Sequence, residues 1–150
     1  YLPGDADRLP TGEIRDVAGT PFDLRTPQRF ADAVRGTHDE QIRSARGYDH
    51  CFVLGRQAAS QPRRAARVEE TGTGRTLELL TTDPGLQVYS GALLAPVEDG
   101  QPAEVAALSD GFCLEPERFP DAPNRPEFPS ARLDPGAPYR QVTVYRFSAV

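Results

Sequence analysis

Residues 112–130 of this 150-residue chain read FCLEPERFPDAPNRPEFPS, and helix is nearly impossible across most of this stretch. Five prolines interrupt it, at positions 116, 120, 123, 126 and 129. Each proline removes a backbone donor and fixes φ, and it pushes the preceding residue toward an extended conformation. The apolar run at 112–114 therefore predicts a strand that ends at Glu115, followed by a stiff, ordered loop. A carboxylate held at a strand end in this way is well placed to act as an acid or a base.

Strand-like segments recur through the rest of the chain, and turn signals separate them. Residues 48–54, YDHCFVL, are aromatic and β-branched between two glycines, which is typical of a strand. The glycines of TGTG at 71–74 supply the positive φ of a hairpin turn, so the segments on either side are predicted to pair. The further predicted strands are 66–70, 75–81, 86–90 and 141–148. Because no helices alternate with these strands, the sequence predicts an all-β fold, an antiparallel β-sandwich.

One short helix is expected between the strand segments. Thr26 offers a cap hydroxyl and Pro27 suits the first helical position, so the helix is predicted to start there and to end at Gly36. The polar run at 37–44 is expected to be a loop. Coil or loop is also predicted for residues 1–25, 57–64 and 97–110.

Composition narrows the possible partners. The formal net charge is -5, and all 17 basic residues are arginine, a usage typical of high-GC bacterial genomes. An acidic domain lacks the basic footprint that nucleic acid requires, and the cluster Arg63, Arg64 and Arg67 is expected to be a solvated face. No apolar run approaches the roughly 18 residues of a membrane helix. Cys51 and Cys113 lack metal-ligand spacing and lie in apolar runs, so buried free thiols are expected, with a disulfide as the alternative.

Four segments of the chain carry a family resemblance. The 112–130 stretch resembles the C-terminal signature of the galactose mutarotase (aldose 1-epimerase) family, CLEPQxFPDAPNxPxFPS. LPTGEIRDVAGTPFDLR, GYDHCFVL and TTDPGLQVYSG are similar to the family's IPTGExxPVxGTPFDFR, GYDHNFVL and TxxPGxQFYTGN. The departures are small: Glu117 and Arg118 replace the more usual Gln and His or Asn, and Cys51 and Ala92 each replace an Asn.

The resemblance implies that residues 1–150 are the C-terminal part of a single aldose 1-epimerase domain. That domain is a β-sandwich of the mutarotase type, and its N-terminal part is absent from this sequence. In the family, the residue corresponding to Glu115 is the catalytic base, and those corresponding to Asp49 and Gln87 bind sugar hydroxyls. The implied activity is that of an isomerase, which interconverts the α and β anomers of a free hexose such as galactose or glucose with no cofactor and no metal.

Taken singly, these three residues have plainer interpretations. A strand Asp often satisfies backbone donors at a turn, a strand Gln often lies on a solvated face, and a Glu before Pro often marks an exposed loop end. Their joint occurrence inside three matching motifs favours the functional interpretation for Glu115, Asp49 and Gln87.

Mutarotation requires an acid as well as a base, and neither histidine of this chain suits the role. His50 follows Asp49 directly, so it is expected to point to the opposite face of its strand, and His38 lies in a polar, exposed run. In the family the acid is a His from the N-terminal part, where a second His and an Asn-Arg pair also bind sugar. The chain alone is therefore expected to be inactive, with the hexose and the missing N-terminal part as its partners.

Other functions stay open on the sequence alone. An epimerase for a phosphorylated hexose would want arginines at the site, and Arg118 and Arg125 lie near the signature. A non-catalytic carbohydrate-binding fragment would retain Asp49 and Gln87. The period-three prolines from 120 to 129 could bind an SH3- or WW-like partner as polyproline, although the aromatic flanks favour an ordered loop. The expected compartment is the cytoplasm, with secretion left open because the N-terminus is missing.

Overall fold

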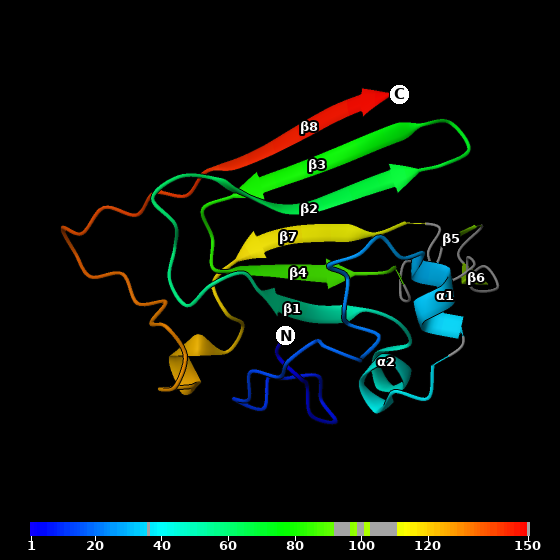
Figure 1. Cartoon of the computed structure of the whole chain (residues 1–150). Helices are drawn as coiled ribbons and strands as arrows, with labels where there is room; N and C mark the ends of the chain where they lie inside the picture. The colour runs from blue at the N-terminus through cyan, green and yellow to red at the C-terminus, as the bar shows by residue number, and fades with distance from the viewer. Residues whose placement is uncertain (36, 92–96, 99–100, 103–110, 150) are drawn as a thin grey trace. The chain divides into compact units, whose positions relative to one another are not determined.

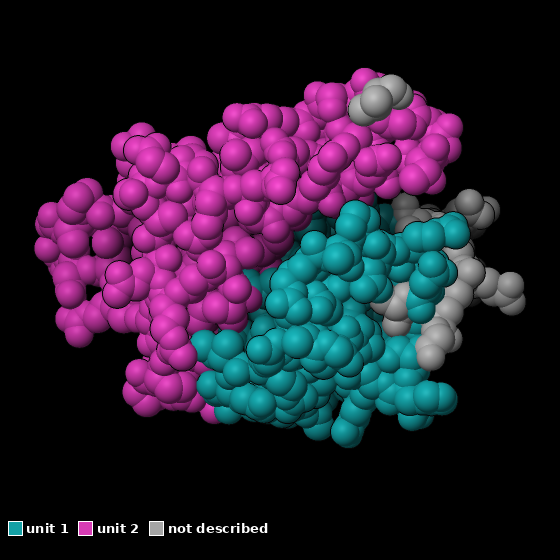
Figure 2. All heavy atoms as spheres, viewed as in Figure 1, with its two compact units in different colours: residues 1–52, 87–115 teal, residues 53–86, 116–150 magenta. Residues whose placement is uncertain are grey.

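The computed structural model describes residues 1–35, 37–91, 97–98, 101–102 and 111–149. The chain divides into two compact units, each made of two segments: residues 1–52 with 87–115 form unit 1, and residues 53–86 with 116–150 form unit 2 (Figure 2). In chain order, the elements labelled in Figure 1 and a 3-10 helix, η1, are α1 (Phe30–Arg35), α2 (Glu40–Ala45), β1 (Asp49–Val53), β2 (Arg63–Glu70), β3 (Arg75–Thr81), β4 (Gly85–Tyr89), β5 (Val97–Glu98), β6 (Gln101–Pro102), β7 (Cys113–Glu117), η1 (Ala122–Asn124) and β8 (Thr143–Ala149).

Unit 2 is built on a three-stranded antiparallel sheet with the order β2-β3-β8. β2 pairs with β3 through a register that shifts once near the start of β2, and β3 pairs with β8 along its whole length. Glu70 closes the turn between β2 and β3, because its carboxylate accepts hydrogen bonds from the backbone N–H groups of Gly72 and Thr73 at 2.6 and 2.7 Å. The predicted hairpin is therefore present, and its turn is held by a side chain as well as by glycine.

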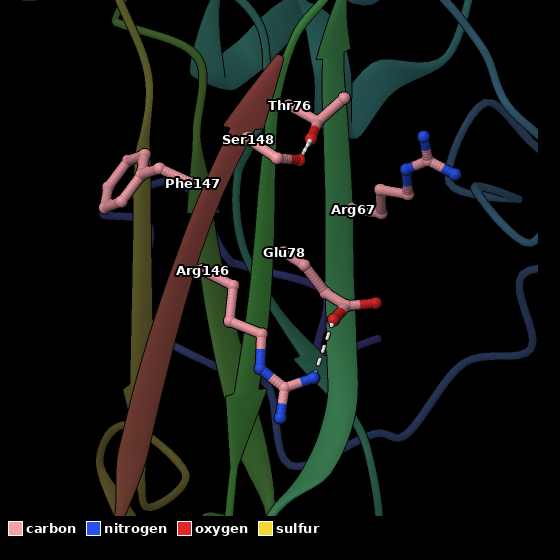
Figure 3. Close-up of a pocket in the computed structure, with 6 residues that line it drawn as sticks. All are labelled: Arg67, Thr76, Glu78, Arg146, Phe147 and Ser148. Atoms are coloured by element: carbon pink, nitrogen blue, oxygen red, sulfur yellow. Dashed lines mark hydrogen bonds and ion pairs between the residues drawn. The ribbon is translucent and has the colours of Figure 1, made fainter. Parts of the chain in front are cut away.

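The β2-β3-β8 sheet has one apolar and one polar face, because side chains alternate along each strand. On the apolar face, Leu77 lies opposite Phe147 and Leu79 lies opposite Tyr145. Burial differs sharply across this face: Leu79 is 0% exposed, whereas Phe147 is 77% exposed. The facing pairs on the polar side are Glu78 with Arg146 and Thr76 with Ser148 (Figure 3).

Unit 1 holds the parts of β1, β4 and β7 that carry the motif residues, in a sheet with the order β1-β4-β7 (Figure 1). Rings from alternate positions of β1 and the residue before it gather on one face. Phe22 lies among them, with its ring centroid 5.7 Å from that of Tyr48, 4.7 Å from that of His50 and 6.1 Å from that of Phe52. The aromatic cluster of unit 1 comprises Tyr1, Phe22, Phe30, Tyr48, His50 and Phe52.

Residues 4–10, the N-terminal turn, form a closed loop in unit 1. Its two ends make an isolated β-bridge, and the N–H of Asp5 donates to the carbonyl of Leu9 at 2.9 Å. Gln41 of α2 makes two hydrogen bonds with the backbone of Gly4: its Oε1 accepts from the N–H at 2.7 Å, and its Nε2 donates to the carbonyl at 3.0 Å. The N-terminal turn is thus fixed both internally and to a helix.

The proline-rich loop after β7 is ordered, as the sequence predicted. Phe119 and Phe128 are both buried and pack edge to face, with ring centroids 5.3 Å apart. Asp121 adopts a left-handed backbone conformation with φ +59, and its carboxylate accepts from Asn124 Nδ2 at 2.6 Å and from Arg125 Nε at 3.1 Å. Buried aromatics and side-chain hydrogen bonds therefore add to the stiffness that the prolines supply.

The all-β class is confirmed, but several predicted element boundaries are wrong. β7 does not end at Glu115 and continues through Pro116 to Glu117, since an edge strand can accommodate a residue without a backbone donor. α1 starts at Phe30, not at Thr26. The residues before α1 form a turn instead, in which Gln28 Nε2 donates to the carbonyl of Asp23 at 3.0 Å. The predicted helix end at Gly36 lies outside the described residues.

The polar run predicted as a loop at 37–44 contains α2. The Asp39 carboxylate caps this helix by accepting from the N–H groups of Gln41 and Ile42 at 2.9 and 3.2 Å, and Ile42 is 1% exposed. One cap and one apolar anchor suffice for a helix of this length when tertiary contacts support it.

Two further segments predicted as loops contain strands. β2 begins at Arg63, inside the predicted loop 57–64. β5 and β6 fall within the predicted loop 97–110, whose remaining positions lie outside the described residues. Neither cysteine forms a disulfide, as expected. Cys51 is buried as predicted, whereas Cys113 is half-buried. Within the described ranges, no helix has both the length and the apolar character that a membrane crossing demands.

Candidate functional site

The three predicted site residues come from the three strands of the unit 1 sheet. Asp49 is the first residue of β1, Gln87 is the central residue of β4, and Glu115 is the central residue of β7. Because β4 lies between the other two strands (Figure 1), Gln87 occupies the middle of this set. Segments 38 and 66 residues from Asp49 along the chain thus contribute to one sheet.

The alternation of side chains decides which face these residues occupy. Tyr48, His50 and Phe52 belong to the aromatic cluster, so Asp49 points to the opposite face. Gln87 Nε2 donates a hydrogen bond to Asp49 Oδ1 at 2.9 Å, which places Gln87 on the same face as Asp49.

Glu115 is assigned to this face by its neighbours. The ring of Phe112 lies 6.1 Å from that of Phe30 in the aromatic cluster, so side chains an even number of positions from Phe112 share the cluster face. Phe112 directly precedes β7. From the alternation of side chains we infer that Glu115, three positions further on, faces away from the cluster, as Asp49 and Gln87 do. The carboxylate is exposed, and among the described residues it bonds neither Asp49 nor Gln87. We call the face that carries Asp49, Gln87 and Glu115 the site face.

The polar atoms of the site face are only partly satisfied by the protein. Asp49 Oδ2 lies 3.8 Å from Arg8 Nη1, a distance typical of an ion pair and not of a hydrogen bond. Gln87 Oε1 is buried and accepts no hydrogen bond in the described part of the chain. A buried acceptor without a donor is costly, so this atom indicates a place where a ligand hydroxyl could donate.

Sequence reasoning did not single out Arg8, whose guanidinium lies beside Asp49. Arg8 lies in the N-terminal turn with a left-handed backbone conformation, φ +65, far from any of the motif positions. A non-glycine residue with positive φ is uncommon, yet nothing in the local letters DADRLP requires it. Only the tertiary placement of the turn brings its guanidinium to Asp49.

Neither histidine of the chain belongs to the site face. His50 is 5% exposed, and burial in the aromatic cluster lowers its pKa to about 4, because the imidazolium form would lose its solvation there. Its Nδ1 accepts a hydrogen bond from the backbone N–H of Asp49 at 3.1 Å. His38 is exposed in the segment before α2. The prediction that His50 points away from the Asp49 side agrees with these contacts.

The two arginines that suggested a phosphorylated substrate are engaged within unit 2. The guanidinium of Arg118 lies 5.9 Å from the ring centroid of Tyr139, and Arg125 pairs with Asp121 at 3.1 Å. Arg125 therefore pairs within the proline-rich loop, and Arg118 contacts a ring in the segment before β8.

The β2-β3-β8 sheet carries an open depression on its polar face (Figure 3). None of the three predicted site residues lines it. Arg146 Nη1 lies 3.3 Å from Glu78 Oε2, and Arg64 Nη1 lies 3.6 Å from Glu78 Oε1. Arg63 differs from its neighbours in the cluster, since its Nη2 donates to the carbonyl of Asp83 at 2.9 Å. Arg64 and Arg146 share the Glu78 carboxylate, whereas Arg67 pairs with Glu69 at 3.1 Å. The predicted solvated face is present at the exposed Arg64 and Arg67, but not at Arg63, which is half-buried.

Carboxylate and amide groups on one sheet face can bind a polyhydroxylated molecule, because a hydroxyl group both donates and accepts hydrogen bonds. Asp49 accepts, Gln87 offers one acceptor and one further donor, and Glu115 is a carboxylate open to solvent. These groups can orient a sugar and exchange a proton with it.

Comparisons of this sequence with a family model and with curated proteins agree on one family. The sequence model of the family described as Aldose 1-epimerase matches residues 1–146. Galactose mutarotase of Rattus norvegicus is 40% identical over 148 residues, which are 99% of this chain and 41% of the relative. Aldose 1-epimerase of Escherichia coli (strain K12) is 38% identical over 155 residues, with 99% of this chain and 42% of the relative covered.

A solved structure supports the same relationship. A GalM/aldose epimerase homologue from C. elegans superposes with a TM-score of 0.79 at 26% sequence identity, covering 100% of this chain and 43% of that one. The chain thus spans about two fifths of the length of the relatives it matches. On the match that extends over residues 1–146, the chain belongs to the aldose 1-epimerase family.

Proposed function

We propose that the protein to which this chain belongs interconverts the α and β anomers of a free hexose, with Glu115 as the general base and Asp49 and Gln87 as sugar-binding residues. The observation that carries the proposal is the hydrogen bond from Gln87 Nε2 to Asp49 Oδ1, which joins two of the three residues on neighbouring strands. Glu115, on the third strand of the same sheet, is inferred to face the same side. In this proposal the chain is the C-terminal part of one catalytic domain.

The reaction that this arrangement suits transfers only protons. Glu115 removes the proton of the anomeric hydroxyl, an acid protonates the ring oxygen, and the bond between the anomeric carbon and the ring oxygen breaks. The resulting aldehyde rotates about the adjacent carbon–carbon bond, and the reverse transfers close the ring as the other anomer. Each positioned acid or base contributes typically about 10²–10⁴-fold in rate. Groups that hold the sugar ring in register add to this by fixing the reacting atoms.

The acid in this scheme comes from the part of the domain that the chain does not span. His50 is buried on the opposite face of β1, and its low pKa keeps it neutral at physiological pH, so it cannot protonate a ring oxygen bound on the site face. His38 lies in an exposed segment outside the sheet. The 150-residue chain alone is therefore expected to lack activity, in line with its coverage of 41% of the rat relative.

A free sugar fits the site better than a phosphorylated one. Arg118 and Arg125 are held by Tyr139 and Asp121, and the site face carries the carboxylates of Asp49 and Glu115, which repel an anion. A non-catalytic sugar-binding role would also use Asp49 and Gln87, but it leaves Glu115 without a task.

The test is the rate at which fresh α-D-galactose and α-D-glucose approach anomeric equilibrium, followed by polarimetry. The chain is assayed alone and after fusion to the N-terminal portion of the E. coli relative. The fusion is expected to accelerate the approach, and Glu115→Gln is expected to lower that rate by about 10²–10⁴-fold. Glu127→Gln, an exposed carboxylate in the proline-rich loop, is the matched control and should retain the rate. Acceleration that survives Glu115→Gln would show that Glu115 is not the base, and sugar binding without acceleration would support the binding fragment.

A further inference from the structure

The N-terminal turn holds one arginine beside the site face in a way that local sequence does not require. Arg8 has φ +65, a conformation that costs a non-glycine residue free energy and that clusters at functional sites. The turn is fixed by the β-bridge at its ends and by the paired hydrogen bonds between Gly4 and Gln41. The strained residue is therefore held in place by the surrounding contacts.

The side chain of Arg8 retains most of its hydrogen-bonding capacity. A guanidinium carries five N–H donors, and none of them is within hydrogen-bond distance of an acceptor among the described residues. The nearest charged partner is Asp49 Oδ2, at 3.8 Å from Nη1. Since 49% of the side chain of Arg8 is exposed, a ligand bound to Asp49 can reach these donors.

Arg8, beside the site face, and Asp49 and Gln87, on it, offer complementary groups. Arg8 supplies donors, Asp49 a carboxylate and Gln87 a buried acceptor that lacks a donor. We call these three residues the row. Asp49 Oδ1 already accepts from Gln87 Nε2, but a carboxylate has about four lone-pair positions. A sugar hydroxyl between Arg8 and Asp49 can accept from the guanidinium and donate to Oδ2. A neighbouring hydroxyl can donate to Gln87 Oε1, the buried atom that lacks a donor.

We propose that Arg8 is a third sugar-binding residue, and that the row Arg8–Asp49–Gln87 recognises two adjacent hydroxyls of a neutral sugar. This inference rests on the proposed function and adds the recognition of the substrate to it. The positive charge of Arg8 is matched by Asp49, and Glu115 adds a negative charge to the same face. The row consequently suits a neutral polyhydroxyl compound and disfavours a sugar phosphate.

The test is a titration of the ¹⁵N-labelled 150-residue chain with D-galactose and D-glucose, followed through the Arg Nε–Hε and Gln side-chain NH₂ signals. The titration is repeated on the fusion protein. Signals of Arg8 and Gln87 should shift together with one dissociation constant. Arg8→Gly, which fits the positive φ without strain, should weaken binding about tenfold, the loss expected for hydrogen bonds from a charged group. Arg8→Lys should weaken it by about threefold, since the charge stays but the planar fork of donors is lost.

The matched control is Arg46→Gly. Arg46 is also an exposed arginine in the left-handed region, with φ 57 at the end of α2, and its removal should change binding less than twofold. A binding constant for Arg8→Gly within twofold of that of the parent chain overturns the inference. If Gln87 responds to sugar but Arg8 does not, the Arg8 inference falls and the proposed function stands. If neither signal responds to either sugar in the chain or the fusion, both fall.

A series of monodeoxygalactoses separates direct contact from a structural effect. Removal of the one hydroxyl that Arg8 holds should abolish the tenfold difference between the parent chain and Arg8→Gly, while the other deoxy sugars should preserve it. If Arg8→Gly weakened the binding of every deoxy sugar by the same factor, Arg8 would act only through the shape of the turn. That result would overturn the proposed contact.

Discussion

Acid should destabilise unit 1 through a single buried imidazole. His50 is 5% exposed within the aromatic cluster, and burial lowers its pKa from 6.5 to about 4. Above pH 6.5 the imidazole is neutral in both the folded and the unfolded chain, so it contributes no pH dependence there. Between pH 6.5 and about 4 the unfolded chain takes up a proton that the folded chain rejects. The free energy of unfolding therefore falls as the pH falls, and the fall stops growing below about pH 4.

The magnitude follows from the two pKa values. Each pH unit within the window lowers the free energy of unfolding by about 1.4 kcal/mol. With a folded pKa of about 4 for His50, the loss relative to neutral pH is about 1.4 kcal/mol at pH 5.5 and about 2.5 kcal/mol at pH 4.5. These losses are large fractions of the stability of an ordinary domain.

Urea unfolding at pH 7.5, 6.5, 5.5 and 4.5 measures the effect. The chain has no Trp, so the near-ultraviolet circular dichroism of the tyrosines, two of which lie in the aromatic cluster, reports on unit 1. His50→Asn removes the titration but keeps a side-chain acceptor for the N–H of Asp49. The parent chain should lose about 2.5 kcal/mol more than this variant between pH 7.5 and 4.5.

Carboxylates also titrate in this range, so the difference between the two proteins carries the prediction. His38→Asn, at the exposed histidine, controls for the replacement of a histidine outside the aromatic cluster. Parallel curves for the parent chain and His50→Asn would refute the reasoning, because they would show that His50 is protonated as easily in the folded chain as in the unfolded one.

Three further predictions concern packing and capping. Leu79→Ala should lower the free energy of unfolding, measured by urea titration, by about 2–5 kcal/mol. Phe147→Ala, on the same face but largely exposed, should lower it by less than about 0.5 kcal/mol, and equal losses would contradict the role of burial. Gly47→Ala should destabilise by about 1–3 kcal/mol, because its Cβ would overlap Ser90 Oγ, and a melting temperature equal to that of the parent would contradict this clash. Asp39→Ala should cost about 1 kcal/mol through loss of the α2 cap, measurable as faster amide exchange in α2, and unchanged exchange there would show that the cap is dispensable.

Most of the strands, and the opposite orientations of Asp49 and His50, were accessible from sequence because both depend on period-two patterns. The alternation in YDHCFVL separates Asp49 from His50, and the structure places His50 in the aromatic cluster. The turn glycines at 71–74 correctly marked the β2-β3 hairpin. The roles of Glu115, Asp49 and Gln87 came from the family motifs and stay predictions.

Other features depend on contacts that no local pattern encodes. α2 is short and mostly polar, so its composition favoured a loop. Its stability comes from the Asp39 cap and from the burial of Ile42. Arg8 approaches Asp49 because tertiary contacts place the N-terminal turn. Gln41, 37 residues along the chain from Gly4, bonds the backbone of Gly4, and the N–H of Leu2 donates to the carbonyl of Cys51 in β1. Pro116 was expected to stop a strand, but it lies in an edge strand, where a missing donor is tolerated.

The opposed faces of β1 have a consequence for how this sequence can diverge. Asp49 serves the site face and His50 fills the aromatic cluster, so the two are related by a shift of one position. A single-residue insertion or deletion just before this strand would exchange their places. It would bury a carboxylate among aromatic rings and remove it from the site face in one event. Length changes here should therefore be far rarer among relatives than substitutions, whereas the exposed turn at 71–74 should tolerate both.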